Sequence, residues 1–254
     1  MYGMSQLTAI IKTFQRPRAL DRLIRSIRRF YPDLSIAVAD DGLTPSPRGD
    51  VDYLRLPVDV GLSAGRNALL RRIRTPYFLL LDDDLEFFRQ TRIERLLELV
   101  ASGVADIAGG DYYRCKRKLL FIRRRWQPFH GIFRFHDGDL RLVRDTHANH
   151  PKYQLCDVVH NFFVGRTADI LALGGWDEEL KLNEHVEFFV RLHRRGVRVA
   201  YCPDVIARHW MERSADYTPY RDRDFTGMAA KKIGVRRVNR FDGQPIAGTS
   251  RQSS

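Results

Sequence analysis

Three consecutive aspartates, Asp82, Asp83 and Asp84, directly follow the apolar run YFLLL at residues 77–81. Carboxylates at positions i and i+2 after a strand can converge on one divalent cation, and hard oxygen ligands suit Mg²⁺ or Mn²⁺. Such a cation would cancel the repulsion among the three charges, grip a diphosphate and stabilise the charge that grows on a departing phosphate. The alternative is a solvated turn or helix cap, because acidic residues also favour helix N-termini.

Two other segments have the composition of a nucleotide site. Asp40, Asp41 and Gly42 end an earlier apolar run, and Asp41 can accept hydrogen bonds from a base imide or a ribose hydroxyl. The segment VGLSAGRNALL at 60–70 places small residues before Arg66 near a helix start, which suits close approach by a phosphate. Arg66 can instead be a surface arginine.

Strand-like and helix-like patterns alternate through the first half of the chain, so these acids should lie at strand ends. Near-continuous apolar strands separated by helices favour an α/β fold with a mostly parallel sheet and helices on both faces. Ligands bind such sheets beyond the carboxyl ends of the strands. We expect strands at 7–14, 35–41, 51–56, 75–81 and 104–110, and helices at 20–30, 63–73 and 91–103.

The second half is more basic and aromatic. The pattern predicts a hairpin at 132–143 that turns at Asp137-Gly138, and a polar, frayed tail at 236–254. Further elements are a strand at 156–166, a helix at 167–175, a helix at 184–196 and two strands within 197–210.

Composition limits the class of protein. A chain of 254 residues with 44% hydrophobic residues can bury one full core, so we expect a single domain. No apolar run approaches the roughly 20 residues of a membrane span, and the N-terminus lacks a secretion-signal layout. Three cysteines at irregular spacing fit no disulfide framework, which favours a cytoplasmic protein. The net charge of +12 attracts polyanions, unless the arginines only cover solvated faces.

Six segments occur in an order that resembles the GT-A glycosyltransferases of the family 2 type. They are IIKTFQRP, VADDG, VGLSAGRN, FLLLDDDLEF, GGWDEEL and NEHVEFFVRL. In addition, IIKTF, IRRFYP and VVHNFF are similar to catalytic domains of β-1,4-N-acetylgalactosaminyltransferases of the GM2/GD2 synthase type. The resemblance covers roughly 7–210. It implies a GT-A domain at 1–235, with a nucleotide-binding half at about 5–110 and an acceptor half at about 111–215.

The resemblance assigns donor and metal roles. Asp84 would be the direct ligand of Mn²⁺ or Mg²⁺ with Asp82 as the second, and His209 occupies the place of a C-terminal histidine that reaches the metal. His209 can equally be a core residue. The residues implied for the nucleotide and donor sugar are Thr13 against the uridine, Asp41 on the uracil, Arg66 near the nucleotide, Asp83 near the ribose or sugar, and Gly110 in the sugar pocket.

The chain departs from the resemblance at the catalytic base. His185 stands where inverting GT-A enzymes often carry an aspartate, with Glu184 before it and Glu187 two residues after. An imidazole with a pKa near 6.5 is a competent general base at neutral pH. Glu184 is the rival base, and its alternative role is to complement a helix dipole.

The segment GGWDEEL would lie under the acceptor. The resemblance implies that Trp176 stacks on a sugar and that Asp177 bonds its hydroxyls, with Asn161 lining the same pocket. The alternative is a structural turn with a core tryptophan.

The predicted function is a metal-dependent inverting glycosyltransferase. It would move GalNAc or another hexose from a UDP-sugar to a hydroxyl of a glycan or glycolipid. A sugar-nucleotide nucleotidyltransferase is one alternative, but IIKTFQRPRAL lacks the glycines of that class. A nucleic-acid or anionic-membrane binding module is the other, motivated by the basic stretch 114–125. A binding module of this kind gives the acidic clusters at the strand ends no role. We therefore expect at most peripheral contact with an anionic membrane and no nucleic-acid partner.

Overall fold

The computed structural model describes residues 3–117, 122–126, 128–211, 220, 225–239 and 241. Within them, one sheet has the strand order β10-β11-β13-β6-β12-β4-β1-β2-β3, with β5 paired to β13 and β7 paired to β6. The strands of its nucleotide-binding half are β1 (Leu7–Thr13), β2 (Ser35–Asp40), β3 (Asp52–Arg55) and β4 (Tyr77–Asp82). The remaining strands of this sheet are β5 (Leu85–Glu86), β6 (Ile107–Arg117), β7 (Ile122–Trp126), β10 (Ala148–His150), β11 (Tyr153–Cys156), β12 (Phe162–Arg166) and β13 (Val199–Trp210).

The predicted α/β fold with a central, mostly parallel sheet is confirmed. β4, β1, β2 and β3 are parallel to one another, and β13 is parallel to β6. β12 lies between β4 and β6 and is antiparallel to both. The carboxyl ends of β1, β2 and β4 therefore meet at one edge of the sheet.

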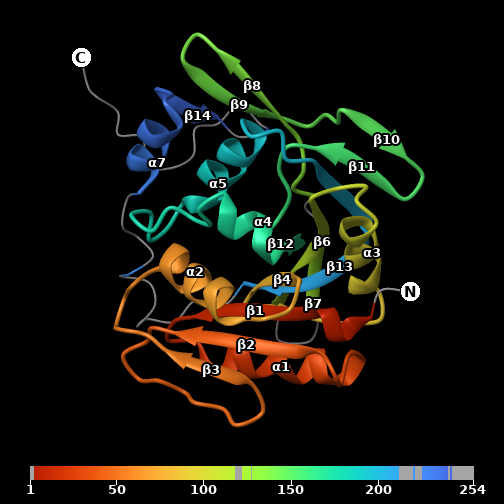
Figure 1. The fold of residues 1–254 in the computed structure, drawn as a ribbon, viewed down its shortest axis with the longest axis vertical. Coiled ribbons are helices and arrows are strands. Elements are labelled where there is room, and N and C mark those ends of the chain that lie inside the picture. Colours follow the sequence, from red (N-terminus) through yellow and green to blue (C-terminus); the bar gives the residue numbers. More distant parts are fainter. Residues whose placement is uncertain are drawn as a thin grey trace.

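Helices cover both faces of this sheet (Figure 1). The apolar sides of α1 (Pro17–Phe30) and α3 (Ile93–Ala101) belong to one buried cluster. Those of α2 (Leu62–Arg72), α4 (Thr167–Ala172) and α5 (Glu184–His193) belong to the other. In β4, Leu79 and Leu81 join the first cluster while Phe78 and Leu80 join the second. Side chains alternate across a strand, so a strand buried on both faces must be continuously apolar, as YFLLL is.

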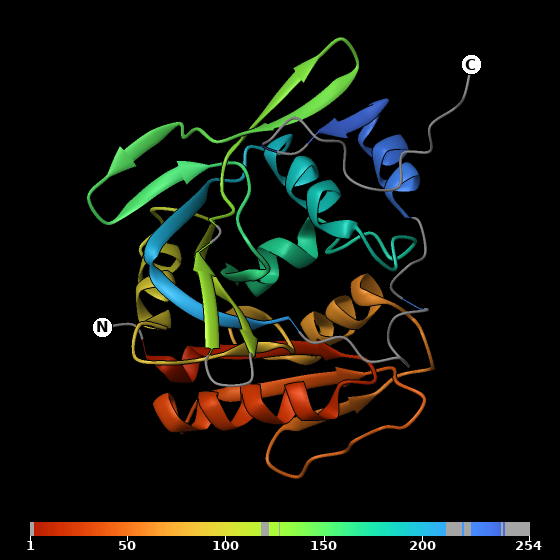
Figure 2. The ribbon, with the colours of Figure 1, turned by 180° about the vertical axis from the view of Figure 1, so that it is seen from behind.

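Two hairpins extend from the end of the molecule away from α1 (Figure 2). The predicted hairpin is confirmed as β8 (Ile132–His136) and β9 (Asp139–Val143). Asp137 and Gly138 have φ of 48° and 73°, the left-handed conformation that a tight hairpin turn needs. β10 and β11 form the second hairpin.

Three boundaries differ from the prediction. The strand expected at 156–166 is divided into β11 and β12, because Asp157 and Val158 bond the backbone of Gly131 instead. The two strands expected within 197–210 are the single strand β13, with a register shift between Tyr201 and Ile206. In the predicted tail, Arg237–Asn239 form β14, which pairs with β9 and follows α7 (Thr226–Ile233). Residues 240 and 242–254 lie outside the described part of the chain. None of the described helices is long and apolar enough to cross a bilayer.

Candidate active site

The acidic triplet lies at the carboxyl edge of the sheet, where β4 ends. In the pairing of β1 with its neighbours, Lys12 is level with Asp82 and Thr13 is level with Asp40. The two acidic clusters therefore lie at one edge, on either side of β1, as the sequence predicted. The Lys12 ammonium lies between them and forms an ion pair with Asp41. Burial lowers the pKa of Lys12, although Asp41 opposes that shift.

Asp41 is fully buried and contacts protein groups in this structure. Its Oδ2 accepts a hydrogen bond from the Gly61 backbone N–H at 3.0 Å. Gly61 has φ of 97°, and a Cβ there would lie 2.7 Å from Lys181 Cα, so only glycine fits. The uracil contact predicted for Asp41 would therefore require this buried arrangement to open.

Arg16, which the sequence reasoning missed, binds the triplet directly. It lies just before α1, and its guanidinium pairs with Asp83 and donates from Nη1 to Asp84 Oδ2 at 2.8 Å. Thr13 Oγ1 donates to Asp83 Oδ2 at 2.7 Å, so Thr13 positions Asp83. Arg16 belongs to the IIKTFQRP segment, but it lies 67 residues before Asp83 in the chain, so its contact with the triplet is visible only in the folded structure.

The three carboxylates have different electrostatic surroundings. Burial raises the pKa of Asp83, against the opposing charge of Arg16. Burial also acts to raise the pKa of Asp84, but the Arg16 guanidinium and the neighbouring His209 imidazole outweigh it and the pKa is lowered. Burial raises the pKa of Asp82, although 36% of its side chain is exposed. Asp84 is therefore the member of the triplet held most firmly as an anion.

Arg66 is a buried residue, so the surface alternative is wrong. Its guanidinium, 1% exposed, donates to Asp82 Oδ1 at 3.1 Å and pairs with Glu184. The cation also lies 5.5 Å from the centre of the Trp176 ring. Arg66 thereby connects the triplet to the start of α5. Glu184 is 2% exposed and bound to this arginine, which makes it a poor candidate for an acceptor-facing base.

His209 reaches the triplet from β13, as predicted. Its Nε2 lies 3.2 Å from Asp84 Oδ1, an oxygen that is buried and has no described hydrogen bond. An unbonded carboxylate oxygen opposite an imidazole nitrogen fits a divalent cation held between them. Among the described residues, no group of three or more histidine, cysteine or acidic side chains could hold a metal. A metal at Asp84 and His209 would therefore take its other ligands from diphosphate oxygens and water, as Mg²⁺ sites commonly do.

His185, the predicted base, is held by a second predicted residue. Its Nδ1 lies 2.7 Å from Asn161 Oδ1. That oxygen can only accept, so Nδ1 carries the proton and Nε2 is the nitrogen with the lone pair. Burial, followed by the charges of His160 and Arg66, lowers the pKa of His185 to about 3. The imidazole is neutral at pH 7, which is the state that a general base needs.

A row of aromatic rings connects the metal-facing histidine to the candidate base. Tyr112 packs on His209 with ring centres 4.7 Å apart and stacks on His160 at 3.7 Å. Phe129 contacts both His160, at 5.1 Å, and His185, at 5.3 Å. The sequence reasoning did not identify Tyr112, His160 or Phe129, because they come from β6, the β11–β12 connection and the segment before β8. Their side chains line up only in the folded chain.

Asp111 supports this row. Its carboxylate is fully buried and lies 3.1 Å from His160 Nε2. It also accepts hydrogen bonds from Tyr201 Oη at 2.6 Å and Trp126 Nε1 at 2.7 Å. A buried carboxylate with several partners fixes the orientation of His160 beneath Tyr112.

The predicted acceptor role of Trp176 is wrong. The side chain is 1% exposed and stacks on Phe188 with ring centres 4.6 Å apart, so neither face is open to a sugar. The core alternative is correct. Asn67 holds the turn by accepting from Trp176 N at 2.9 Å. Asp177 also has a protein partner, since Lys232 Nζ lies 2.6 Å from its carboxylate.

Two other residues predicted to belong to the site, Glu187 and Gly110, pack against neighbouring protein groups. Glu187 is buried and pairs with Arg191 one turn along α5, and Arg191 also donates to the carbonyls of Leu173 and Gly175. A Cβ on Gly110 would lie 2.5 Å from the Val205 carbonyl oxygen. The position predicted to line a sugar pocket is therefore filled by β13, and its glycine permits close packing of strands.

The chain is similar in sequence to known glycosyltransferases. Residues 8–166 match the family model described as "Glycosyl transferase family 2". A β-1,4 N-acetylgalactosaminyltransferase 1 from Rattus norvegicus is 34% identical over 217 residues, which cover 82% of this chain and 40% of the relative. A β-1,4 N-acetylgalactosaminyltransferase 2 from Mus musculus is 32% identical over 215 residues, covering 80% and 39% respectively. The chain thus spans about 40% of the length of these relatives.

Solved glycosyltransferase structures share the fold. A crystal structure of GalNAc-T7 with UDP, GalNAc and Mn²⁺ has a TM-score of 0.64 at 15% identity, covering 83% of this chain and 44% of that one. A structure of S. aureus TarS 1-349 with UDP-GlcNAc has a TM-score of 0.61 at 13% identity, covering 89% and 64%. The resemblance to the GT-A fold and to the β-1,4-N-acetylgalactosaminyltransferases is confirmed. This chain belongs to glycosyl transferase family 2.

Proposed function

We propose that this chain is a metal-dependent, inverting glycosyltransferase domain that uses a UDP-sugar, with GalNAc as the first candidate sugar. The observation that carries the proposal is the position of His209 Nε2, 3.2 Å from the unbonded Oδ1 of Asp84 at the carboxyl edge of the sheet. The names of the relatives support GalNAc, and the neighbouring structures were solved with UDP or UDP-GlcNAc. The acceptor would be a hydroxyl of a glycan or glycolipid.

Asp84 and His209 would hold Mn²⁺ or Mg²⁺, which when bound supplies positive charge to the diphosphate. Arg16 adds a second cation at the same place, because it already pairs with Asp83 and Asp84. Arg66 orients Asp82 and, through Glu184, the first turn of α5 that carries His185. The protein thus concentrates positive charge where the leaving UDP gains negative charge.

His185 would act as the base through Nε2. The acceptor oxygen forms a bond to the anomeric carbon, the bond from that carbon to the phosphate oxygen breaks, and UDP leaves with the electron pair. The acceptor proton passes to Nε2, while Asn161 keeps Nδ1–H in place. Burial is the main cause of the lowered pKa of His185, and the negative charge of a bound donor would act in the opposite direction, which makes the ring a stronger base.

A thermal-shift panel tests the core of the proposal. UDP-GalNAc, UDP-GlcNAc, UDP and an ADP-sugar are each added with and without Mn²⁺. We expect stabilisation by UDP compounds that requires Mn²⁺ and is absent in Asp84→Asn. Asp52→Asn, which changes a carboxylate paired with Arg72 on the surface, is the matched control. Indifference of the wild-type protein to every UDP compound contradicts the proposal.

The stereochemistry has its own test. If the mechanism is a single displacement, the anomeric configuration of the product is opposite to that of the UDP-sugar. A proton NMR spectrum of the first product formed from UDP-GalNAc measures it. Retention of configuration contradicts the inverting part of the proposal. It does not bear on the proposed metal site.

A further inference from the structure

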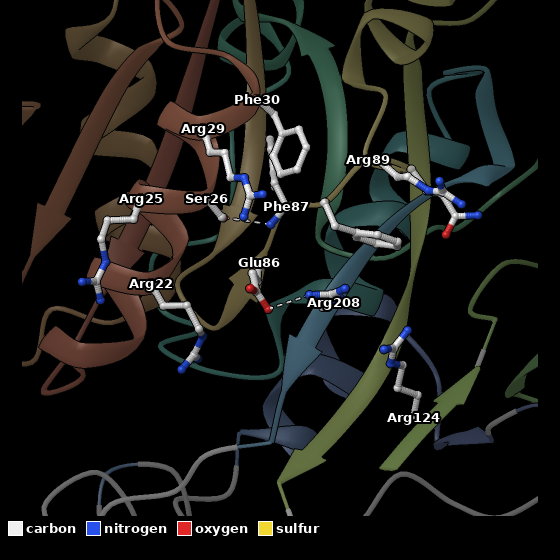
Figure 3. A pocket seen from close by; sticks show the side chains of 12 residues that line it. Arg22, Arg25, Ser26, Arg29, Phe30, Glu86, Phe87, Arg89, Arg124 and Arg208 are labelled. Carbon is white, nitrogen blue, oxygen red and sulfur yellow. Dashed lines mark hydrogen bonds and ion pairs between the residues drawn. The ribbon is translucent and has the colours of Figure 1, made fainter. Parts of the chain in front are cut away.

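A second pocket lies on the opposite side of β13 from the candidate metal site. It has a volume of about 570 Å³ and is walled by α1, the segment after β5, β7 and β13. Figure 3 shows that arginines from all four walls surround this space. We call it the arginine pocket; its arginines are Arg22, Arg25, Arg29, Arg89, Arg124 and Arg208, and its one acidic side chain is Glu86.

The pocket is separate from the site assigned to the donor. Arg208 and His209 are consecutive residues of β13, so their side chains point to opposite faces of the strand. His209 faces Asp84, whereas Arg208 lies 3.6 Å from Glu86 in the pocket wall. None of the residues that line the pocket belongs to the triplet or contacts it through a described hydrogen bond or ion pair.

Protein carboxylates neutralise only part of its charge. Arg25 pairs with Asp21, and Glu86 serves Arg208 while also accepting a hydrogen bond from Trp210 Nε1 at 2.7 Å. No described carboxylate is within ion-pair distance of three of the four remaining pocket arginines, Arg29, Arg89 and Arg124. These guanidiniums repel one another across the pocket, and a multiply charged anion would relieve that repulsion.

The walls also orient the guanidiniums. Arg208 lies 4.8 Å from the centre of the Phe88 ring, and Arg29 lies 5.6 Å from that of Phe30. Arg22 in turn lies 5.2 Å from the Trp210 ring. An aromatic face restricts the orientation of a guanidinium that rests on it, and the planar fork of a guanidinium matches the oxygens of a phosphate group.

We propose that the arginine pocket binds a ligand with a phosphomonoester or clustered phosphate groups. Three arginines with no described carboxylate at ion-pair distance, Arg29, Arg89 and Arg124, favour a ligand with two or more negative charges over a single carboxylate. The volume is that of a small-molecule or headgroup site. Such a ligand would be either a soluble phosphate compound or the headgroup of an anionic lipid, which share this chemistry.

The soluble ligand is tested with inorganic tripolyphosphate by isothermal titration calorimetry, without divalent cations. The test variant is the triple substitution Arg29→Gln, Arg89→Gln and Arg124→Gln. We expect the affinity for tripolyphosphate to fall by about tenfold or more in this variant, because three direct donors are removed. Arg16→Gln, at the triplet, should retain pocket binding and so separates the two anion sites.

The lipid source is tested by co-sedimentation with phosphatidylcholine vesicles that contain or lack phosphatidic acid. The pocket variant should lose the binding that depends on phosphatidic acid if the ligand is a headgroup. If the pocket variant loses binding to tripolyphosphate, the ligand is a soluble phosphate compound. If it loses binding to vesicles that contain phosphatidic acid, the ligand is a lipid headgroup.

The matched control removes three exposed arginines elsewhere, as Arg74→Gln, Arg141→Gln and Arg195→Gln. It changes the net charge by the same amount, so general attraction of anions would weaken equally in both variants. Loss confined to the pocket variant supports the proposal. The proposal is overturned if both variants lose anion binding equally or if neither variant loses it. It is also overturned if the wild-type protein binds neither tripolyphosphate nor the vesicles. Metal-dependent UDP binding by the pocket variant shows that it is folded and that the donor site is independent.

Discussion

His209 Nε2 lies 3.2 Å from Asp84 Oδ1, which brings the last strand of the large sheet against the end of β4. The other oxygen of Asp84 accepts from Arg16 at 2.8 Å. Asp84 is therefore held from two sides by positive or metal-binding groups, and one of its oxygens still lacks a hydrogen bond. This arrangement distinguishes Asp84 from its two neighbours and underlies the first prediction.

Asp84→Asn should reduce transfer from a UDP-sugar by about 100-fold or more and abolish its dependence on Mn²⁺. The amide removes the charge that would hold the cation, at a site where electrostatic groups commonly contribute factors of this size. Initial rates measured across a Mn²⁺ titration check it. Activity that still rises with Mn²⁺ in this variant would refute the assignment of Asp84.

The pair formed by Arg66 and Glu184 should contribute strongly to folding. Arg66→Met leaves Glu184 buried without a partner, so we expect a loss of about 3–5 kcal/mol in the free energy of unfolding. The double variant Arg66→Met with Glu184→Leu should recover part of this loss, since the buried charge of Glu184 is removed together with that of its partner. Urea unfolding of the three proteins measures both effects. A double variant as unstable as the single one would contradict this explanation.

His185 should make stability depend on pH. Its pKa in the folded protein is lowered to about 3 by burial, below the ordinary value near 6.5. As the pH falls through 6.5 the unfolded chain gains a proton that the folded chain does not, so the folded state loses stability down to about pH 3. His185→Asn should reduce the difference in unfolding free energy between pH 7 and pH 5, whereas His136→Asn, at an exposed site, should leave it unchanged. A difference of wild-type size in His185→Asn would show that this histidine is not the group concerned.

Trp176 should act on stability and not on acceptor binding. Trp176→Ala removes a ring buried between Arg66 and Phe188 and should cost about 3–5 kcal/mol of unfolding free energy. Trp176→Phe keeps an aromatic ring and should retain the wild-type KM for an acceptor, since no face of the tryptophan meets the solvent. A large increase in acceptor KM for Trp176→Phe with unchanged stability would restore the stacking role.

Much of the nucleotide-binding half could be read from the sequence because its signals are local. The apolar run before Asp82 predicts a strand buried on both faces, and parallel strands bring their carboxyl ends to one edge. The place of the triplet and its nearness to Asp41 therefore follow from residues adjacent in the chain. The family was visible for the same reason, since its motifs are short segments that follow one another in order.

The partners of these residues could not be predicted in this way. Whether Arg66 was a surface or a buried arginine depended on α5, which is distant in the sequence and supplies Glu184. The position of Trp176 could not be predicted either. A tryptophan in a turn can stack on a sugar or pack in the core, and the sequence fitted both.

The sequence by itself determined the alternating α/β pattern, the acidic strand end and the family, because periodicity and motif order are properties of neighbouring residues. Only the tertiary structure decided that Arg16 and His209 flank Asp84, that rings from β6 and from two connecting segments link His209 to His185, and that six arginines face one pocket. Those contacts join segments far apart in the chain. Their geometry depends on how the strands cross and which faces the helices cover, which no local pattern specifies.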